Sequence, residues 1–365
     1  MYHRFSKRKE EERRKEEKRR GEKRRAQDAM GASQSGYSYV ALTQWLLEGS
    51  KRFGRVGFEK SALSFTPLPE NLSNLNFVVT GANTGLGKCT AMYLASRKAT
   101  VHILCRNKER GELARNEMLS GCGGAGNVIL HLVDLASVKE VRKWAESWES
   151  SNPTLHGLIC NAGFIPQSHS LTSEGLEPSW ATALTQSYLL VDLLTPSLLR
   201  ASESSSGGFT TRSPPARVVI VSSAGGFNVR CDVQDLNGER RKFDGALQYC
   251  HTKRAQMLLA EVWGGKLPQD KVHVSSMHPG WSDTEGVRTQ LPDFHEKRKG
   301  ELRSVSQGAD TIIWLATSPS LPPHSAGCLF FDRAVTKADY PLAGTRSTPE
   351  EIAQLWQVCK DACGR

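Results

Sequence analysis

Residues 76–87, which read Asn-Phe-Val-Val-Thr-Gly-Ala-Asn-Thr-Gly-Leu-Gly, constrain the fold of this chain more than any other stretch. Phe77, Val78 and Val79 form a short apolar run rich in β-branched residues, typical of a strand buried on both faces. Three glycines follow, and residues 88–97 then run without glycine or proline, as expected of a helix. A strand, a glycine turn and a helix direct backbone N–H groups and a positive helix end toward a phosphate. The stretch therefore predicts a nucleotide site, although such glycines can also serve the turn alone.

Strand and helix patterns alternate along the rest of the chain. We predict strands at 76–80, 100–105, 128–133, 157–160, 217–222, 271–277 and 327–331, and helices at 85–97, 108–120, 137–150, 174–200, 247–264 and 306–317. Strands that alternate with helices predict parallel pairing with right-handed crossovers. We therefore expect an α/β fold, a Rossmann-type doubly wound seven-stranded parallel sheet flanked by helices in a single domain.

Charge divides the chain unevenly. Its 48 Lys and Arg exceed its 38 Asp and Glu by a net charge of +10, and residues 1–30 alone hold 13 basic and 7 acidic side chains. The body is close to neutral, so we expect no nucleic-acid partner. We predict a mobile charged extension at 1–36, an amphipathic segment at 37–70, the nucleotide-binding domain at 71–345 and a C-terminal helix at 346–365.

Residues 37–65 admit two interpretations. They combine aromatic and basic side chains, among them Tyr37, Trp45, Arg52 and Phe58. We expect them to pack on the domain as an N-terminal helix, and the alternative is peripheral contact with a membrane surface. The nine cysteines include no C-x-x-C pair, and the chain opens with charged residues in place of a signal-peptide core. No apolar run reaches about eighteen residues. These features predict a cytoplasmic protein.

The residues after the second predicted strand bear on cofactor choice. In dinucleotide sites an acid about twenty residues past the glycines binds the ribose 2′-hydroxyl, whereas a basic group there binds a 2′-phosphate. This chain has Arg106 and Asn107 at that place and no carboxylate. Because a guanidinium can bind a phosphate through two hydrogen bonds, we expect NADP(H) in preference to NAD(H). A plain surface arginine is the alternative.

Tyr249 and Lys253 lie four residues apart in a predicted helix. This spacing places both side chains on one helix face. A phenol with a pKa near 10 is a poor acid at neutral pH, and a fixed cation beside it lowers that pKa. Tyr249 can then donate a proton to a carbonyl oxygen. The spacing alone is a weak signal, because a chain with seven tyrosines often shows it by chance.

Thr80–Gly87 resembles the T-G-x-x-x-G-x-G signature of the short-chain dehydrogenases/reductases, and the later motifs follow in the order of that family. The resemblance implies an NADP-linked oxidoreductase without a metal ion. It implies a cofactor site made of Gly81, Asn83, Thr84, Gly85, Leu86, Gly87, Asp134, Asn161, Ala162, Gly163, Tyr249, Lys253, Pro279, Gly280 and Thr284. Asp134 would contact the adenine, and its alternative role is in a helix-cap region beside Ser137.

The same resemblance assigns the catalytic residues. The family places its catalytic serine at the end of the strand at 217–222; we choose Ser223, with Ser222 as the alternative. Lys253 would also bind the nicotinamide ribose. Residues 243–245, 276–281, 308–311 and 330–333 resemble one group within the family, and the likeness extends over roughly 40–362.

Two positions depart from the family pattern. Cys160 replaces the first asparagine of N-N-A-G, a mild change. Residues 180–188 read W-A-T-A-L-T-Q-S-Y against a family pattern F-A-x-N-T-L-G-x-Y, so Ala183 replaces an asparagine that helps to hold a water beside the catalytic lysine. Thr182 or Thr185 is a candidate substitute. We expect a reductase of a lipophilic carbonyl or alcohol substrate, and the alternative is an NADPH-binding pseudoenzyme.

Overall fold

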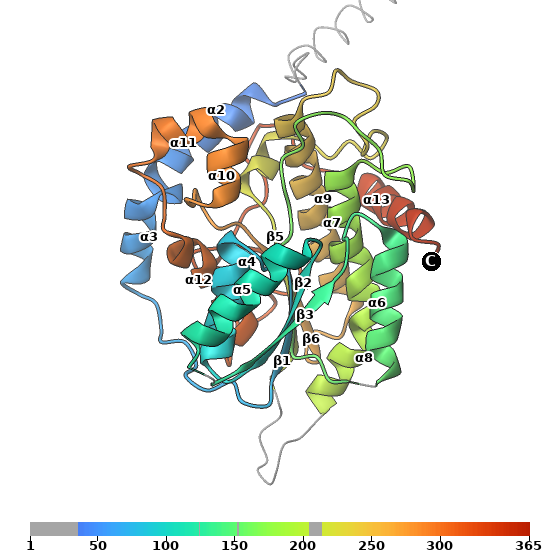
Figure 1. The fold of residues 1–365 in the computed structure, drawn as a ribbon. Coiled ribbons are helices and arrows are strands. Elements are labelled where there is room, and N and C mark those ends of the chain that lie inside the picture. Colours follow the sequence, from blue (N-terminus) through green and yellow to red (C-terminus); the bar gives the residue numbers. More distant parts are fainter. Residues whose placement is uncertain (1–35, 124, 152, 204–213) are drawn as a thin grey trace, which may run out of the picture.

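The structure is a computed structural model that describes residues 36–123, 125–151, 153–203 and 214–365. The charged extension predicted at 1–36 lies outside the described residues, apart from Gly36. The described chain is organised around one sheet (Figure 1). Its strands are β1 (Asn76–Thr80), β2 (Thr100–Cys105), β3 (Asn127–Leu132), β4 (Gly157–Cys160), β5 (Ala216–Val221), β6 (Val272–Met277), β7 (Leu329–Phe331) and β8 (Ala334–Thr336).

The strand order is β3-β2-β1-β4-β5-β6-β7-β8, and the first seven strands of the chain pair in parallel. This arrangement confirms the predicted doubly wound α/β fold. The order reverses between β1 and β4, and in such sheets the crevice at the carboxyl ends of the strands receives the ligand. The eighth strand pairs antiparallel with β7 and was not predicted.

A two-residue turn joins β7 to β8. Its residues Asp332 and Arg333 have φ values of +48° and +59°. Such a turn needs positive φ at both central positions, and Asn-Gly is its usual sequence. Here Asp332 is paired with Arg303, and Arg333 with Asp310. The sequence did not predict this hairpin, because its turn lacks a typical turn sequence and is held by ion pairs to residues distant in the chain.

Helices cover both faces of the sheet (Figure 1). They are α2 (Tyr39–Glu48), α3 (Arg55–Ala62), α4 (Gly85–Ser96), α5 (Lys108–Gly121), α6 (Val138–Ser150), α7 (Pro178–Leu184), α8 (Leu190–Glu203), α9 (Gly245–Lys266), α10 (Glu285–Gln290), α11 (Pro292–Arg298), α12 (Val305–Thr317) and α13 (Pro349–Ala362). Alternate residues of β1 point to opposite faces: Val78 packs in the core with α6–α9 and α13, whereas Phe77 and Val79 pack in the core with α4, α5 and α12.

The long helix predicted at 174–200 starts later and is interrupted. Glu177 caps α7 by accepting hydrogen bonds from the backbone N–H groups of Ser179 and Trp180, and Pro178 occupies the first turn. A π-helical turn at Thr185–Leu189 separates α7 from α8. Such turns are often found at functional sites, and this one brings Gln186 and Ser187 toward the crevice region described below.

Residues 37–65, which we call the N-terminal strap, pack on the domain. Phe53, in a π-helical turn between α2 and α3, is buried against Trp281 and Phe331. Trp45 of α2 lies with its ring centroid 5.3 Å from that of Trp281. The sequence allowed either packing on the domain or contact with a membrane surface. The inner face of this segment packs on the domain. Among the described residues, none of the helices has the length and apolar character needed to span a bilayer.

Candidate active site

The glycine turn between β1 and α4 has the shape that a pyrophosphate needs. Gly81 and Gly85 have φ values of +61° and +56°, which only glycine adopts without strain. A Cβ on Gly87 would collide with the side chain of Asn161. Thr84 precedes α4, and its side chain does not cap the helix, which leaves the N–H groups of the first turn for an anion. The residues present thus fit the phosphates of a dinucleotide.

Thr80 and Asn161 tie this turn to β4. The backbone N–H groups of Asn161 and Ala162 donate to Thr80 Oγ1 over 2.8 and 3.0 Å. Asn161 Nδ2 donates to the Thr80 carbonyl oxygen over 2.9 Å. The Asn161-Ala162-Gly163 segment therefore fixes the position of the glycine turn relative to the end of β4.

A buried glutamine completes this connection, and sequence reasoning missed it. Gln186 Oε1 accepts from Thr80 Oγ1 at 2.7 Å, and Gln186 Nε2 donates to the Ala162 carbonyl at 2.6 Å. Cys160 Sγ donates to the Gln186 backbone oxygen at 2.9 Å. The available signal was that Gln186 occupies the position of a glycine in the resembled pattern. In this chain the departures at Cys160 and Gln186 contact each other.

The side chains expected near the adenosine lie together at the edge of the crevice. Arg106 is 71 % exposed, and its guanidinium lies 3.9 Å from the carboxylate of Asp134. Asn107 caps α5 by accepting from the backbone N–H of Arg110, so its side chain is already used. Asp134 also accepts from the backbone N–H of Ala136, in line with the capping alternative.

Glu285, which sequence reasoning did not single out, crosses the opening of the glycine turn. Its carboxylate accepts from Thr84 Oγ1 at 2.7 Å and forms an ion pair with Arg110 at 2.8 Å. Thr284, the preceding residue, lies against Gly85 and caps α10. The loop after β6 is therefore fastened to the glycine turn and to α5, which brings Thr284 to the predicted cofactor site.

Tyr249, on α9, lies beside Ser223, the residue that follows β5. The sequence predicted a lowered pKa for Tyr249, but burial raises it to about 12, and a hydrogen bond with the Ser223 side chain opposes that shift only in part. Ser222 has a different contact: its hydroxyl donates to the Lys253 backbone oxygen over 2.7 Å. Of the two serines, Ser223 is the one that contacts the tyrosine, and Ser222 fastens α9 to the sheet.

Lys253 lies one turn beyond Tyr249, with its Nζ 5.5 Å from the centre of the phenol ring. Burial lowers the pKa of Lys253 to about 7, so its protonation changes near neutral pH. Its ammonium donates to the Val221 carbonyl at 2.9 Å and to Gln256 Oε1 at 2.8 Å. A Cβ on Gly163 would lie 3.1 Å from Nζ, so the glycine leaves the ammonium its space.

The position of the missing asparagine is filled by apolar packing. Ala183 is 2 % exposed and belongs to the core on the α7–α9 side of the sheet. The hydroxyls of the candidate substitutes Thr182 and Thr185 donate to the carbonyls of Pro178 and Leu135. The side-chain acceptor for Lys253 is instead Gln256, whose Nε2 donates to Ser187 Oγ at 2.9 Å.

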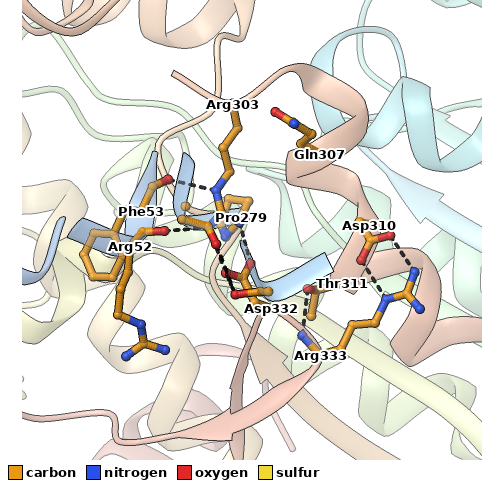
Figure 2. Close-up of polar contacts among 12 residues, drawn as sticks. Arg52, Phe53, Pro279, Arg303, Gln307, Asp310, Thr311, Asp332 and Arg333 are labelled. Atoms are coloured by element: carbon orange, nitrogen blue, oxygen red, sulfur yellow. Dashed lines mark hydrogen bonds and ion pairs between the residues drawn. The ribbon is translucent and has the colours of Figure 1, made fainter. Parts of the chain in front are cut away.

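The loop Pro279–Thr284 is held by a buried ion pair that the sequence did not reveal (Figure 2). Arg303 binds the Asp332 carboxylate through both terminal nitrogens, at 2.5 and 2.9 Å. Arg303 Nε and the Trp281 backbone N–H both donate to the Phe53 carbonyl oxygen at 2.8 Å. Gly280 has φ +72°, and a side chain there would collide with Arg303. The N-terminal strap and the β7–β8 turn therefore both support the loop.

Comparisons with known proteins agree with this geometry. Residues 76–293 match the family model described as short chain dehydrogenase. The chain is 37 % identical over 323 residues to dehydrogenase/reductase SDR family member 12 of Bos taurus, covering 88 % of this chain and 97 % of that protein. It is 35 % identical to human retinol dehydrogenase 11 over 79 % of this chain and 85 % of the relative.

Solved structures agree on the fold. An uncharacterized protein from Mycobacterium paratuberculosis is 25 % identical with a TM-score of 0.61, over 81 % of this chain and 96 % of the other. L-sorbose reductase of Gluconobacter frateurii, solved with NADPH and L-sorbose, is 18 % identical with a TM-score of 0.53, over 72 % and 96 %. With the family motifs, these matches confirm the resemblance seen in the sequence: the chain belongs to the short-chain dehydrogenase/reductase family and is an NAD(P)-dependent oxidoreductase of that type.

Proposed function

We propose that this protein is an NADPH-dependent reductase of a lipophilic carbonyl compound, or the dehydrogenase of the corresponding alcohol. The observation that carries the proposal is the meeting of Ser223, Tyr249 and Lys253 at the carboxyl end of β5. Bound NADPH supplies the hydride. Ser223 hydrogen-bonds the carbonyl oxygen, Tyr249 donates the proton to it, and charged Lys253 eases that transfer by stabilising the phenolate.

The preference for NADP(H) is part of the proposal and rests on Arg106. Its guanidinium is exposed at the edge of the crevice, and the site has no acid at the position that would bind a ribose 2′-hydroxyl. Lys253, Thr284 and the Asn161–Gly163 segment would hold the nicotinamide half. Pro279 and Gly280 would present the backbone of their loop to the nicotinamide amide.

The substrate class is proposed from the aromatic surroundings and from the relatives. Trp281 of the loop Pro279–Thr284 packs against Trp45 and Phe294 in tilted and edge-to-face contacts, and these aromatic surroundings suit an apolar ligand. The name of human retinol dehydrogenase 11 points the same way. A cytoplasmic location with peripheral membrane contact through residues 37–65 is the setting that we propose.

Turnover is the test. Purified protein is incubated with NADPH and a panel of aldehydes, ketones, retinoids and steroids, and loss of NADPH absorbance is followed, with Tyr249→Phe as the blank. We expect at least one lipophilic carbonyl to be reduced by the wild type and not by the variant. Equal rates in both proteins would contradict the role of Tyr249.

The second candidate function is an NADPH-binding pseudoenzyme, which the apolar packing at Ala183 favours. If proton relay limits the reductase, Ala183→Asn should raise turnover about ten- to a hundredfold without changing NADPH affinity. Tight NADPH binding with no turnover by either protein across the panel would instead support the pseudoenzyme. Lys253, Tyr249 and Ser223 have all been kept, which is why the reductase is our first proposal.

A further inference from the structure

The outer face of α2 in the N-terminal strap is apolar, although it faces solvent. Tyr39, Val40, Leu46 and Leu47 are 63, 43, 43 and 59 % exposed. Their spacing puts them on one side of the helix, opposite Ala41 and Trp45, which pack inward. A helix on a protein surface normally turns charged and polar residues to water. This helix therefore carries a second apolar face that nothing in the described chain covers.

Further exposed apolar side chains lie elsewhere in the strap and in the loop beside the start of α2. Val56 of α3 and Leu63 just beyond it are 57 and 90 % exposed, and Leu342 is 96 % exposed. The loop that carries Leu342 is joined to the start of α2, because Ser38 donates to the Ala343 carbonyl and Gln44 to that of Pro341. Seven of the eleven large apolar side chains that are exposed among the described residues thus belong to this one region, which we call the strap surface.

Basic residues lie beside the exposed apolar side chains, in α3 and in the π-helical turn before it. Lys51, Arg52, Arg55 and Lys60 are all exposed, and the only acids of α2 and α3, Glu48 and Glu59, are paired with Arg52 and Arg55. Figure 1 shows α11 beside α2, and Phe294 of α11 packs edge to face against Trp281, whose ring also contacts Trp45. The sequence of α11 contains Lys297 and Arg298 as well as the acids Asp293 and Glu296, and Arg298 is paired with Glu301. In the sequence, residues 1–30 contain 13 Lys and Arg against 7 acids.

We propose that the strap surface docks on an anionic phospholipid bilayer. Exposed Leu, Val and Tyr side chains flanked by Lys and Arg suit the boundary between acyl chains and acidic headgroups. A second copy of this chain fits less well, since it would set one basic rim against another. The membrane contact proposed above for residues 37–65 is here assigned to a defined face, the strap surface. This proposal does not depend on turnover.

The strap surface is rigidly connected to the candidate active site. Phe53, which ends the π-helical turn after α2, accepts hydrogen bonds from Trp281 and Arg303, and the Arg55 N–H donates to the Glu301 carbonyl. The strap and the loop Pro279–Thr284 are therefore joined directly by hydrogen bonds. Docking would hold the aromatic side of the site next to the bilayer, from which a lipophilic substrate can enter.

Vesicle sedimentation of the full chain tests the proposal. The vesicles are phosphatidylcholine with and without phosphatidylserine, at low and high salt, and the key variant is Leu46→Gln/Leu47→Gln. Leu113→Gln on α5 is the matched control, because Leu113 is 61 % exposed and lies outside the strap surface. We expect the partition coefficient on phosphatidylserine vesicles to fall about tenfold or more in the double variant and not in the control.

Leu342→Gln provides a second variant whose side chain is too exposed to affect folding, and we expect it to weaken sedimentation as well. NADPH affinity, measured in parallel without vesicles, should not change in any variant, which separates failure of docking from failure of the proposed function.

Equal sedimentation of wild type and double variant would overturn the proposal, because the first 30 residues would then account for binding. A wild-type dimer that the double variant turns into a monomer would overturn it in favour of a second copy. Binding that appears only after residues 1–35 are deleted would assign the surface to that segment.

Discussion

The two halves of the candidate site differ in how far their charged and polar side chains are exposed to water. On the cofactor side, Arg106 pairs with Asp134 and Arg110 pairs with Glu285. The side chains of Arg106, Arg110 and Glu285 are between 50 and 71 % exposed. On the catalytic side, Lys253 and Gln256 are 4 and 0 % exposed and form a hydrogen-bonded chain in the protein interior.

This difference separates residues that tune binding from residues that also support the fold. Exposed ion pairs contribute little to stability because water and salt screen them. A buried polar network is held in a low-dielectric interior, where each lost partner leaves an unsatisfied group. We therefore expect substitutions on the cofactor side to act on affinity alone, and substitutions among buried polar groups to act on turnover or on stability.

Tyr249→Phe should have the largest effect. The variant keeps the ring and removes the proton donor, so turnover should fall about 10²- to 10⁴-fold, whereas NADPH affinity should change far less. Steady-state rates and isothermal titration with NADPH measure the two quantities. Tyr93→Phe on α4, whose hydroxyl only donates to the Pro69 carbonyl, is the control. Loss of NADPH affinity in Tyr249→Phe would show that the two halves of the site are not separable.

Arg303→Met should destabilise the protein by about 3–5 kcal/mol, because it leaves the buried Asp332 carboxylate without its partner. Arg346→Met is the matched control: Arg346 is 79 % exposed and pairs with Asp339 in water, so its loss should destabilise the protein far less. Urea unfolding compares the two. The double variant Arg303→Met/Asp332→Leu should recover part of the stability, and equal losses for the two single variants would break the comparison.

Buried histidines should make the protein sensitive to acid. Burial lowers the pKa of His251 to about 3 and those of His102 and His273 to about 4, from an ordinary value of 6.5. Between pH 6.5 and about 4 the unfolded chain therefore binds more protons than the folded one, so stability falls as the pH falls. We expect the unfolding temperature to drop steeply over this range, and less steeply in His273→Gln. A flat profile would show that these imidazoles are free to take up protons in the folded state.

Arg106→Asp should have the smallest effect on the protein itself and a specific effect on the cofactor. NADPH binding should weaken by about 1–3 kcal/mol, since a charged contact to the 2′-phosphate is lost, and NADH binding should not weaken. Isothermal titration with both cofactors measures this, and the unfolding temperature should stay constant. Equal affinity of the wild type for NADPH and NADH would remove the basis of the predicted preference.

The order of strands and helices could be predicted from the sequence because each element depends on the spacing of residues close together in the chain. Phe77–Val79 alternate between the two core faces, Gly81 and Gly85 have the positive φ values that their turn requires, and Tyr249 and Lys253 share a helix face by spacing alone. The family followed from these motifs and was confirmed by the comparisons.

What only the tertiary structure decided depends on residues that are distant in the chain. Gln186 reaches Thr80, Glu285 reaches Thr84, and Arg303 reaches Phe53 and Asp332. Each side chain is unremarkable in its own segment, and no local pattern marks its partner. The β7–β8 turn, the support of the loop Pro279–Thr284 and the apolar outer face of α2 arise in the same way. Local periodicity determines which elements form, whereas packing between elements determines which polar groups are buried together and which apolar groups remain outside.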